Sequence, residues 1–429
     1  MSSPRLQVAL DFTILDRALR VAREAVDGGA DILEAGTPLI KSEGLDAIRR
    51  LKAEFPQIPV VADLKTMDAG RIEMEMAAKA GAKIAMVLGA ASDSTIKECV
   101  EVGKNYGLQI GVDMVRVEDV VTRARQVTEW GVDLVSIHCP IDDQMLGKDP
   151  FDTARRVAAE VDVPIAVAGG IHSETAAAAV AAGASIVIVG GAITKSENAR
   201  EATAILKRAM ATGQKFESKF FKRQSSENVR EVFQRVSSAN LSDAMHRGGD
   251  IQGVRPVFPQ TRICGPAVTV RTYPGDWAKP VEAIEHCKEG DVLVVDAGGI
   301  YPAVWGELAS ESALQRKISG AVIYGGVRDV DDIRKIGFPC YASVITPTAG
   351  EPKGFGEINV PIKVAGVLVE PGDWIVGDDS GVVRVPKARA VEVANRGMDV
   401  LETENRLRKE IREARTLAEV AQLLRWEKK

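Results

Sequence analysis

The sequence has few cysteines, no excess of positive charge and no long uninterrupted run of apolar residues. Its five cysteines are scattered and never spaced as Cys-x-x-Cys, which argues against a disulfide framework or a zinc site and fits a reducing cytoplasm. The net charge of -5 does not indicate the clustered basic surface that nucleic-acid binding requires. No apolar run approaches the roughly 20 residues that span a bilayer, and residues 1–5 lead directly into an expected strand without a signal peptide. We therefore expect a cytoplasmic protein with neither a nucleic-acid nor a membrane partner.

The length and composition are typical of a globular protein with more than one domain. The chain has 429 residues, of which 45% are hydrophobic and 27% are charged. One hydrophobic core rarely serves a chain of this length, so two domains of roughly 200 residues are expected. The change of pattern along the sequence places an N-terminal domain at residues 1–211, a polar and basic linker at 212–226 and a C-terminal domain at 227–429.

The first domain alternates apolar strand candidates with amphipathic helical stretches, which indicates the α/β class. The expected strands are residues 7–12, 31–36, 59–65, 83–89, 109–115, 134–139, 164–170 and 185–193. Helical periodicity is clearest at residues 15–27, 45–55, 71–80 and 174–182. Eight units of similar length favour a closed (β/α)8 TIM barrel, with a doubly wound open sheet as the alternative.

The second domain has a different pattern, in which a helix at 229–236 precedes short strands separated by glycine-rich turns. We expect strands at residues 263–272, 291–297, 320–324, 340–343 and 364–369, and a charged helical stretch over about 389–426. This pattern predicts a second α/β domain with a strand-rich core of the swivelling type and C-terminal helices.

Ionisable residues follow the expected strands of the first domain. After the strand at 59–65 they have the pattern Asp63-x-Lys65-x-x-Asp68, and Asp11, Glu34 and His138 occupy equivalent strand ends. The carboxyl ends of barrel strands form the active-site face. Unpaired charges are also costly inside a strand, so a functional cluster is favoured over a structural network of ion pairs.

The residue types at these strand ends suit a divalent metal ion. Neighbouring carboxylates of Glu34 and Asp63 fit a hard cation, Mg²⁺ first and Mn²⁺ as the alternative. The ammonium group of Lys65 is expected between Asp63 and Asp68, where it would offset their repulsion and donate to a substrate oxygen.

Two glycine pairs end the seventh and eighth expected strands: Gly169 with Gly170, and Gly190 with Gly191. Backbone N–H groups in such loops, together with the following helix N-terminus, form the phosphate site of many barrels. The two pairs therefore predict a phosphate-binding site.

Residues 5–211 resemble the 3-hexulose-6-phosphate synthases, within the orotidine-monophosphate decarboxylase-like barrels. The matching stretches are residues 6–11, 34–41, 62–70, 167–171 and 187–194. The related keto-gulonate-phosphate decarboxylases look like His-x-x-Arg-Asp at the sixth strand. Here Ile141 stands in the place of that arginine, which favours the aldolase over the decarboxylase.

The resemblance implies a metal-assisted aldol reaction of the ribulose monophosphate pathway. By it, Glu34 and Asp63 bind Mg²⁺, and the two glycine pairs hold the phosphate of ribulose 5-phosphate. Lys65 and the metal would stabilise an enediolate, and His138 would remove the C1 proton, with Asp11 also in the catalytic group. The enediolate would then attack formaldehyde, or the reverse cleavage would run. The Asp68-type residue reaches the partner subunit's site in this superfamily, which implies a dimer.

A second candidate site lies in the C-terminal half. Arg328 and Asp329 follow Gly325-Gly326 at the end of an expected strand, and Glu307 precedes Arg328 by 21 positions. Arginine binds carboxylates in a bidentate manner, and aspartate is a ligand for hard metals. A surface ion pair is the alternative interpretation.

Residues from about 227 to the C-terminus resemble the family of the regulator of ribonuclease E activity A and the 4-hydroxy-4-methyl-2-oxoglutarate aldolases. The resemblance implies that Arg328 and the backbone of Gly306, Glu307, Leu308 and Ala309 bind a pyruvate-like oxo acid, and that Asp329 binds the divalent ion. It also implies a trimer and a glutamate from a neighbouring C-terminal helix, for which Glu404 and Glu410 are both candidates. An oxo-acid aldolase or decarboxylase and a non-catalytic, protein-binding regulator remain the two hypotheses.

Overall fold

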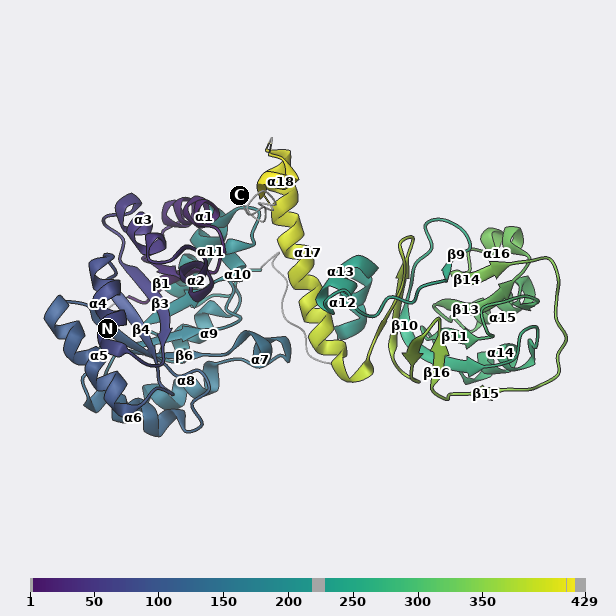
Figure 1. Cartoon of the computed structure of the whole chain (residues 1–429), viewed down its shortest axis with the longest axis horizontal. Coiled ribbons are helices and arrows are strands. Elements are labelled where there is room, and N and C mark those ends of the chain that lie inside the picture. Colours follow the sequence, from purple (N-terminus) through teal and green to yellow (C-terminus); the bar gives the residue numbers. More distant parts are fainter. Residues whose placement is uncertain (1–2, 218–227, 414, 421–429) are drawn as a thin grey trace. The chain divides into compact units, whose positions relative to one another are not determined.

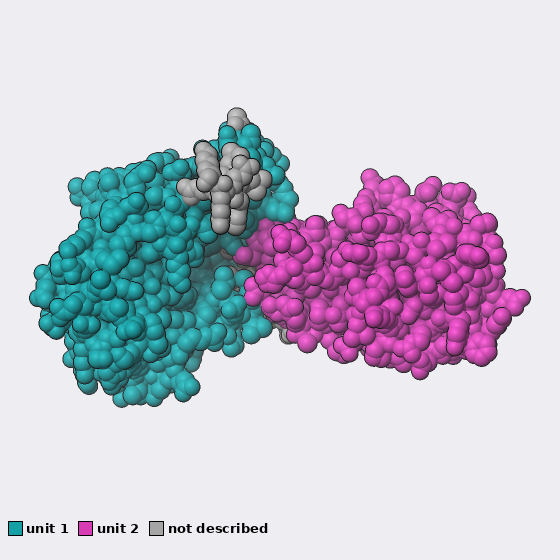
Figure 2. Space-filling view, viewed as in Figure 1, with its two compact units in different colours: residues 1–223, 402–429 teal, residues 224–401 magenta. Residues whose placement is uncertain are grey.

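The computed structural model describes residues 3–217, 228–413 and 415–420. The chain forms two compact units, one comprising residues 1–223 together with 402–429 and the other residues 224–401 (Figure 2). Residues 402–413 and 415–420 thus group with the first unit, whereas the sequence pattern placed the whole of 227–429 in one domain. Most of the expected linker lies outside the described residues.

The first unit contains a closed barrel of eight parallel strands in the order β1 to β8, which confirms the predicted barrel over the open sheet (Figure 1). Every predicted strand is present. The strands are β1 (Arg5–Leu10), β2 (Ile32–Ala35), β3 (Val60–Thr66), β4 (Ile84–Leu88), β5 (Gln109–Asp113), β6 (Leu134–His138), β7 (Ile165–Ala168) and β8 (Ile186–Val189).

Helices between the strands cover the barrel because their apolar residues recur at helical spacing, as Leu15, Leu19 and Ala22 do on α1. The main helices are α1 (Leu15–Asp27), α3 (Asp46–Glu54), α4 (Gly70–Lys79), α5 (Asp93–Tyr106), α6 (Val120–Glu129), α8 (Phe151–Ala158), α9 (Ala176–Ala181) and α11 (Ala199–Thr212). Three short helices stand in the loops after β2, β6 and β8, namely α2 (Thr37–Glu43), α7 (Ile141–Met145) and α10 (Gly191–Thr194).

The interior of the barrel is filled by apolar side chains below its polar mouth. Side chains of a strand alternate between its two faces, so residues two apart share a face. Ile32 lies below Glu34, and Val61 lies below Asp63. The interior cluster comprises Ile32, Val61, Ile84, Met86, Leu134, Ala166 and Ile186.

The second unit is built on a mixed sheet with the main strand order β19-β18-β10-β11-β13-β14-β9. Its strands are β9 (Arg255–Pro256), β10 (Ile263–Arg271), β11 (Val292–Asp296), β12 (Ala303–Trp305), β13 (Gly320–Val327), β14 (Cys340–Ile345), β15 (Glu357–Ile358), β18 (Trp374–Asp378) and β19 (Gly381–Val385). The expected strand at 364–369 was wrong. It is a hairpin of β16 (Ile362–Val364) and β17 (Val367–Val369), because Ala365 and Gly366 turn with φ of 46° and 88°.

The remaining α-helices that the structure describes lie before, between and after these strands in the sequence. They are α12 (Val229–Arg235), α13 (Ser238–Ala244), α14 (Ala278–Glu282), α15 (Glu307–Gln315), α16 (Val330–Ile336), α17 (Ala390–Arg412) and α18 (Leu417–Val420). The expected helix at 389–426 therefore ends earlier, at Arg412, and residues 421–426 lie outside the described part. No helix within the described ranges combines the length and apolarity that crossing a bilayer requires. No two of the five cysteines are joined by a disulfide, and all five are buried.

Candidate functional site

Polar side chains gather at the carboxyl ends of β2, β3, β5 and β6. Glu34, Asp63 and Asp113 are buried, with exposed fractions of 7%, 7% and 3%. His138 lies at the end of β6 and is partly exposed. The barrel thus brings together strand ends that are far apart in the sequence, as predicted for Glu34, Asp63, Lys65 and His138.

Lys65 contacts two carboxylates at this mouth. Its backbone is left-handed, with φ of 49°, and the pairing of β3 with β4 is irregular at this point. Its Nζ lies 3.1 Å from Oδ2 of Asp63 and 2.8 Å from Oδ2 of Asp113. Burial alone would lower the pKa of Lys65, but the carboxylates of Asp113 and Asp63 raise it above its ordinary range. Lys65 is therefore a fixed ammonium group.

The predicted position of Lys65 between Asp63 and Asp68 was wrong. Asp68 is exposed, and its Oδ1 accepts a hydrogen bond from the N–H of Ala69 at 2.7 Å, just before α4 begins. The chain has left β3 by this point, so Asp68 does not share the inner face with Asp63. The role of Asp68 in a partner's site stays a prediction.

Asp113 is the site residue that the sequence reasoning missed. Its Oδ2 contacts Lys65, and it also lies 3.3 Å from Nδ1 of His138. Burial would raise the pKa of Asp113, but the hydrogen bond with His138 and the charge of Lys65 lower it to about 2. Its position at the end of β5 was the available signal, since the same strand-end rule identified Asp63 and Glu34.

Glu34 and Asp11 lie near other negatively charged carboxylates. Burial, and then the charges of Asp63 and Asp11, raise the pKa of Glu34 well above its ordinary value, although its carboxylate accepts a hydrogen bond from Gln7. Desolvation by the surrounding protein, and then the charge of Asp63, also raise the pKa of Asp11. Part of the Asp11 residue nevertheless remains exposed to solvent. A cation would relieve this repulsion.

Glycine at position 36 leaves room for one of these carboxylates. A Cβ at Gly36 would lie only 2.2 Å from Oδ1 of Asp11. Any larger residue at this position would therefore displace the Asp11 side chain.

The donor set fits a divalent cation that completes its coordination with substrate and water. Within the described residues, no three His, Cys, Asp or Glu side chains converge as a ready-made metal site. Mg²⁺ commonly uses only one or two carboxylates and keeps waters or substrate oxygens. Glu34 and Asp63 match that requirement, and Thr37 orients Asp63 through a hydrogen bond of 2.8 Å to Oδ2.

The two glycine pairs lie at the same mouth. Gly169 and Gly170 have φ of 109° and 68°, which a residue with a side chain rarely adopts. A Cβ at Gly169 would also lie 2.5 Å from the carbonyl oxygen of Cys139. Gly190 lies near Asp11, with its Cβ position 3.6 Å from Oδ2, and Gly191 begins α10.

The second unit contains a separate pocket of about 230 Å³ that includes all of the predicted residues of the second site. The residues lining it are Trp277, Val281, Ala303, Val304, Trp305, Gly306, Glu307, Leu308, Ala309, Ser312, Arg328, Asp329 and Ala349. The sequence reasoning did not predict the indole side chains of Trp277 and Trp305, because they lie in segments without a charged motif.

Arg328 and Asp329 are held next to the start of α15. The Nε of Arg328 lies 3.2 Å from Oδ2 of Asp329, and the N–H of Glu307 donates to the same oxygen at 3.4 Å. A Cβ at Gly306 would approach this oxygen to 2.7 Å, so any larger residue there would displace the Asp329 carboxylate. Arg328 and Asp329 are only partly buried, which leaves them accessible to a ligand.

The two candidate glutamates of α17 have different surroundings. Glu410 is buried in the first unit and pairs with Arg406 at 3.2 Å and Arg17 at 3.4 Å. Glu404 is more exposed and pairs with Arg408 at 2.6 Å. Within one chain, Glu404 is the more accessible of the two, and the contribution of either to a neighbouring subunit stays a prediction.

Two family models match the two halves of the chain. One, described as the orotidine 5'-phosphate decarboxylase / HUMPS family, matches residues 4–205, and the RraA-like model, described as Aldolase/RraA, matches residues 238–384. The 3-hexulose-6-phosphate synthase of Bacillus subtilis (strain 168) is 39% identical over 209 residues, which are 48% of this chain and 99% of that protein. The synthase of Mycobacterium gastri is 40% identical over 209 residues, covering 48% of this chain and 100% of its own length.

Solved structures are similar to each half. The 3-hexulose-6-phosphate synthase from Salmonella typhimurium is 35% identical, covers 49% of this chain and 100% of its own, and has a TM-score of 0.47. The RNA-processing inhibitor RraA from Thermus thermophilis is 30% identical, covers 35% of this chain and 92% of its own, and has a TM-score of 0.33. The two family models and the synthase relatives show that the chain is a fusion of a synthase-like barrel with an RraA-like domain.

Proposed function

Residues 4–205 belong to the orotidine 5'-phosphate decarboxylase / HUMPS family, and from this premise we propose that the barrel joins formaldehyde to ribulose 5-phosphate. The product is 3-hexulose 6-phosphate, and the reverse cleavage uses the same groups. The protein is accordingly a lyase, as its relatives named 3-hexulose-6-phosphate synthase are. The observation that carries the proposal is the contact of Asp113 with both Lys65 and His138.

The contacts of His138 suit the removal of the C1 proton. The ionised Asp113 favours a proton on Nδ1 of His138, which leaves the lone pair of Nε2 to act as the base. The electron pair of the broken C1–H bond enters the enediolate, and Lys65 donates to its developing negative oxygen. C1 then forms a bond to the formaldehyde carbon, and the formaldehyde oxygen takes up a proton.

Mg²⁺, or Mn²⁺ in its place, is proposed as the cofactor, held by Glu34 and Asp63. A bound divalent ion would supply Lewis-acid stabilisation of the enediolate oxygens. The glycine pairs 169–170 and 190–191 would hold the phosphate of the substrate through backbone N–H groups. A dimer in which Asp68 reaches the partner's site, and a cytoplasmic location, are part of the same proposal.

Decarboxylation of a keto-gulonate phosphate is the alternative reaction for this barrel. The related decarboxylases look like His-x-x-Arg-Asp at the sixth strand, where this chain has Ile141. Ile141 is exposed at the start of α7. An apolar side chain offers no guanidinium group at that place, and this favours the aldol reaction.

The test is formaldehyde consumption by the purified full chain with Mg²⁺. Consumption should require ribulose 5-phosphate and should fall about a hundredfold or more in Lys65→Ala and Asp63→Ala. Lys79→Ala is the matched control, because Lys79 is an exposed lysine of α4 that pairs with Glu75. Equal rates in wild type, Lys65→Ala and Asp63→Ala would contradict the assignment.

For the RraA-like domain we propose a pocket for a pyruvate-like oxo acid, with Arg328 binding the carboxylate and Asp329 a divalent ion. The pocket formed by these residues supports a ligand site, while a protein-binding regulator is the other candidate function. Pyruvate release from oxaloacetate with Mg²⁺ tests this, comparing wild type with Arg328→Ala. Arg334→Ala is the control, because Arg334 is exposed on α16 and pairs with Asp331. Identical rates in wild type and Arg328→Ala would favour the regulator.

A further inference from the structure

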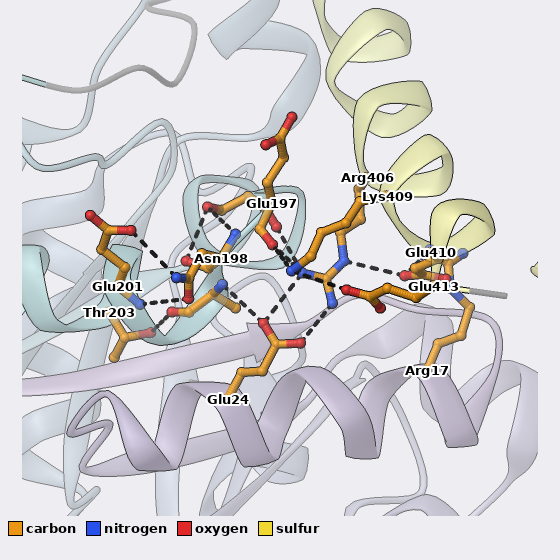
Figure 3. Close-up of polar contacts among 12 residues, drawn as sticks. Arg17, Glu24, Glu197, Asn198, Glu201, Thr203, Arg406, Lys409, Glu410 and Glu413 are labelled. Atoms are coloured by element: carbon orange, nitrogen blue, oxygen red, sulfur yellow. Dashed lines mark hydrogen bonds and ion pairs between the residues drawn. The ribbon is translucent and has the colours of Figure 1, made fainter. Parts of the chain in front are cut away.

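A buried arginine of helix α17, Arg406, lies in the first unit. Arg406 is 4% exposed, and its guanidinium donates from all three nitrogens. Nη2 lies 2.8 Å from Oε1 of Glu24, and Nε lies 3.2 Å from Oε1 of Glu410. Nη1 donates to the carbonyl oxygens of Ser196 at 2.9 Å and Glu197 at 3.3 Å (Figure 3).

These contacts join three segments that are distant in the sequence. Arg406 comes from α17, Glu24 comes from α1, and the two carbonyl groups come from the loop between α10 and α11. Lys409, one turn further along α17, also donates its Nζ to the carbonyl oxygen of Glu197. Figure 3 shows Arg406 and Lys409 both directed from the helix toward Glu197.

The loop at 195–198 directly follows the glycine pair proposed to bind phosphate. Gly190 precedes α10, which runs from Gly191 to Thr194, so the carbonyl groups held by Arg406 lie only five and six residues after Gly191. Burial and the charge of Asp63 raise the pKa of Asp11, and the charge of Lys195 in this loop opposes that rise, so Lys195 lies close enough to act on a carboxylate at the barrel mouth.

Glu24 fixes the other end of the same loop. Its Oε2 accepts a hydrogen bond from the N–H of Ala199 at 3.0 Å, where α11 begins. The side chain of Asn198 caps this helix by accepting from the N–H of Glu201 at 3.1 Å. Burial would raise the pKa of Glu24, but the hydrogen bond and charge of Arg406 lower it. The ion pair therefore ties α17 to both ends of the loop.

We propose that Arg406 is a positioning residue for phosphate binding: from α17 it fixes the loop at 195–198 and thereby the cradle at Gly190 and Gly191. The inference rests on the proposed function, since it names a support for the phosphate site of that reaction. The proposed role of Arg406 also implies that residues 402–412 act as part of the synthase unit. A guanidinium suits this role because its planar set of donors can bind a carboxylate and two carbonyl groups together.

A structural role alone would lower stability and leave substrate binding unchanged, so the test separates KM from kcat. In the full chain, Arg406→Ala should raise the KM for ribulose 5-phosphate about tenfold, with kcat within about twofold of wild type. Inhibition by inorganic phosphate should weaken by the same factor. Arg406→Lys should restore part of the loss, because it keeps the charge but has fewer donors.

Arg408→Ala is the matched control, since Arg408 lies on the same helix and, within the described part of the chain, pairs with residues of that helix, Glu404 and Asn405. Should Arg406→Ala fail to fold, Lys409→Ala provides the milder test, because it removes one exposed donor to the same loop. An unchanged KM and unchanged phosphate inhibition in the folded variants would overturn the proposal.

Hydrogen exchange separates failure of this inference from failure of the proposed function. Inorganic phosphate should slow exchange of the amides at 190–199 in wild type, and Arg406→Ala should speed it, whether or not the protein consumes formaldehyde. Arg408→Ala should match wild type. Exchange at 190–199 that is unaffected by phosphate, or by Arg406→Ala, would reject the role of Arg406 even in an active synthase.

Discussion

Asp113 and His138 lie on neighbouring strands of the barrel, with Oδ2 of the carboxylate 3.3 Å from Nδ1 of the imidazole. The same oxygen is 2.8 Å from Nζ of Lys65. One buried carboxylate therefore orients the proposed base and holds the proposed electrophilic ammonium group. In the proposed reaction, these two groups would have complementary tasks at a single substrate.

Replacing Asp113 with asparagine should lower kcat about a hundredfold with a smaller change in KM. The amide has nearly the same shape but no charge, so it no longer favours the proton on Nδ1 of His138. Steady-state kinetics with ribulose 5-phosphate and formaldehyde measure the effect. Asp27→Asn, at an exposed position of α1, is the control. Wild-type kcat in Asp113→Asn would show that the contact has no catalytic role.

Asp113 should also make the stability of the barrel depend on pH. Its pKa is about 2 in the folded protein, against about 3.9 for an unfolded aspartate. A lowered folded pKa stabilises above the unfolded value, and this contribution, about 2 kcal/mol, is lost as pH falls from about 5 toward 2. The difference in unfolding free energy between wild type and Asp113→Asn should therefore shrink over that range. A difference that grows on acidification would contradict the assignment.

Much of the mouth of the barrel could be predicted because strand ends are visible in the sequence. Glu34, Asp63 and His138 each end an apolar run, and closure of the barrel brings such ends together. The partner of Lys65 could not be inferred from spacing. Asp68 is three residues away in the sequence, but the chain leaves the strand first, whereas Asp113 ends β5, two strands away in the barrel.

The return of α17 to the first unit could not be predicted from local pattern. Arg406 and Glu24 are 382 positions apart, and a basic residue on a charged helix is usually solvated. Only the fold shows that this arginine is buried. The hairpin at 362–369 was missed for a different reason: an apolar run interrupted by Ala365 and Gly366 reads as one strand unless the turn is recognised.

Removal of Mg²⁺ should lower the thermal midpoint of the barrel, and Glu34→Gln should weaken this dependence. Burial, and then the negative charges of Asp63 and Asp11, raise the pKa of Glu34, so a bound cation would relieve the repulsion as well as join the ligands. A free Mg²⁺ concentration of 100 times its dissociation constant would stabilise the folded state by about 2.7 kcal/mol. Thermal unfolding with Mg²⁺ and with a chelator measures the shift in the thermal midpoint. Glu43→Gln is the control, because Glu43 is not one of the predicted metal ligands.

Equal Mg²⁺ shifts in wild type and Glu34→Gln would place the ion elsewhere. The metal-free Glu34→Gln variant should also unfold at a higher temperature than metal-free wild type at neutral pH. The raised pKa of Glu34 makes its ionised form unfavourable in the folded state, and the neutral amide removes that cost.

Gly306→Ala should impair the second site without affecting the first. The added Cβ would lie 2.7 Å from Oδ2 of Asp329 and 3.3 Å from Cγ of Arg328, so both side chains of the proposed oxo-acid site would have to move. A displacement of this kind typically costs about tenfold or more in rate. Pyruvate release from oxaloacetate should fall by that factor, while formaldehyde consumption by the same preparation should stay at the wild-type rate. Because both activities are measured on one molecule, the barrel serves as the control for folding. Parallel loss of both would indicate a general defect, and retention of both would show that pyruvate release does not depend on the geometry of Arg328 and Asp329.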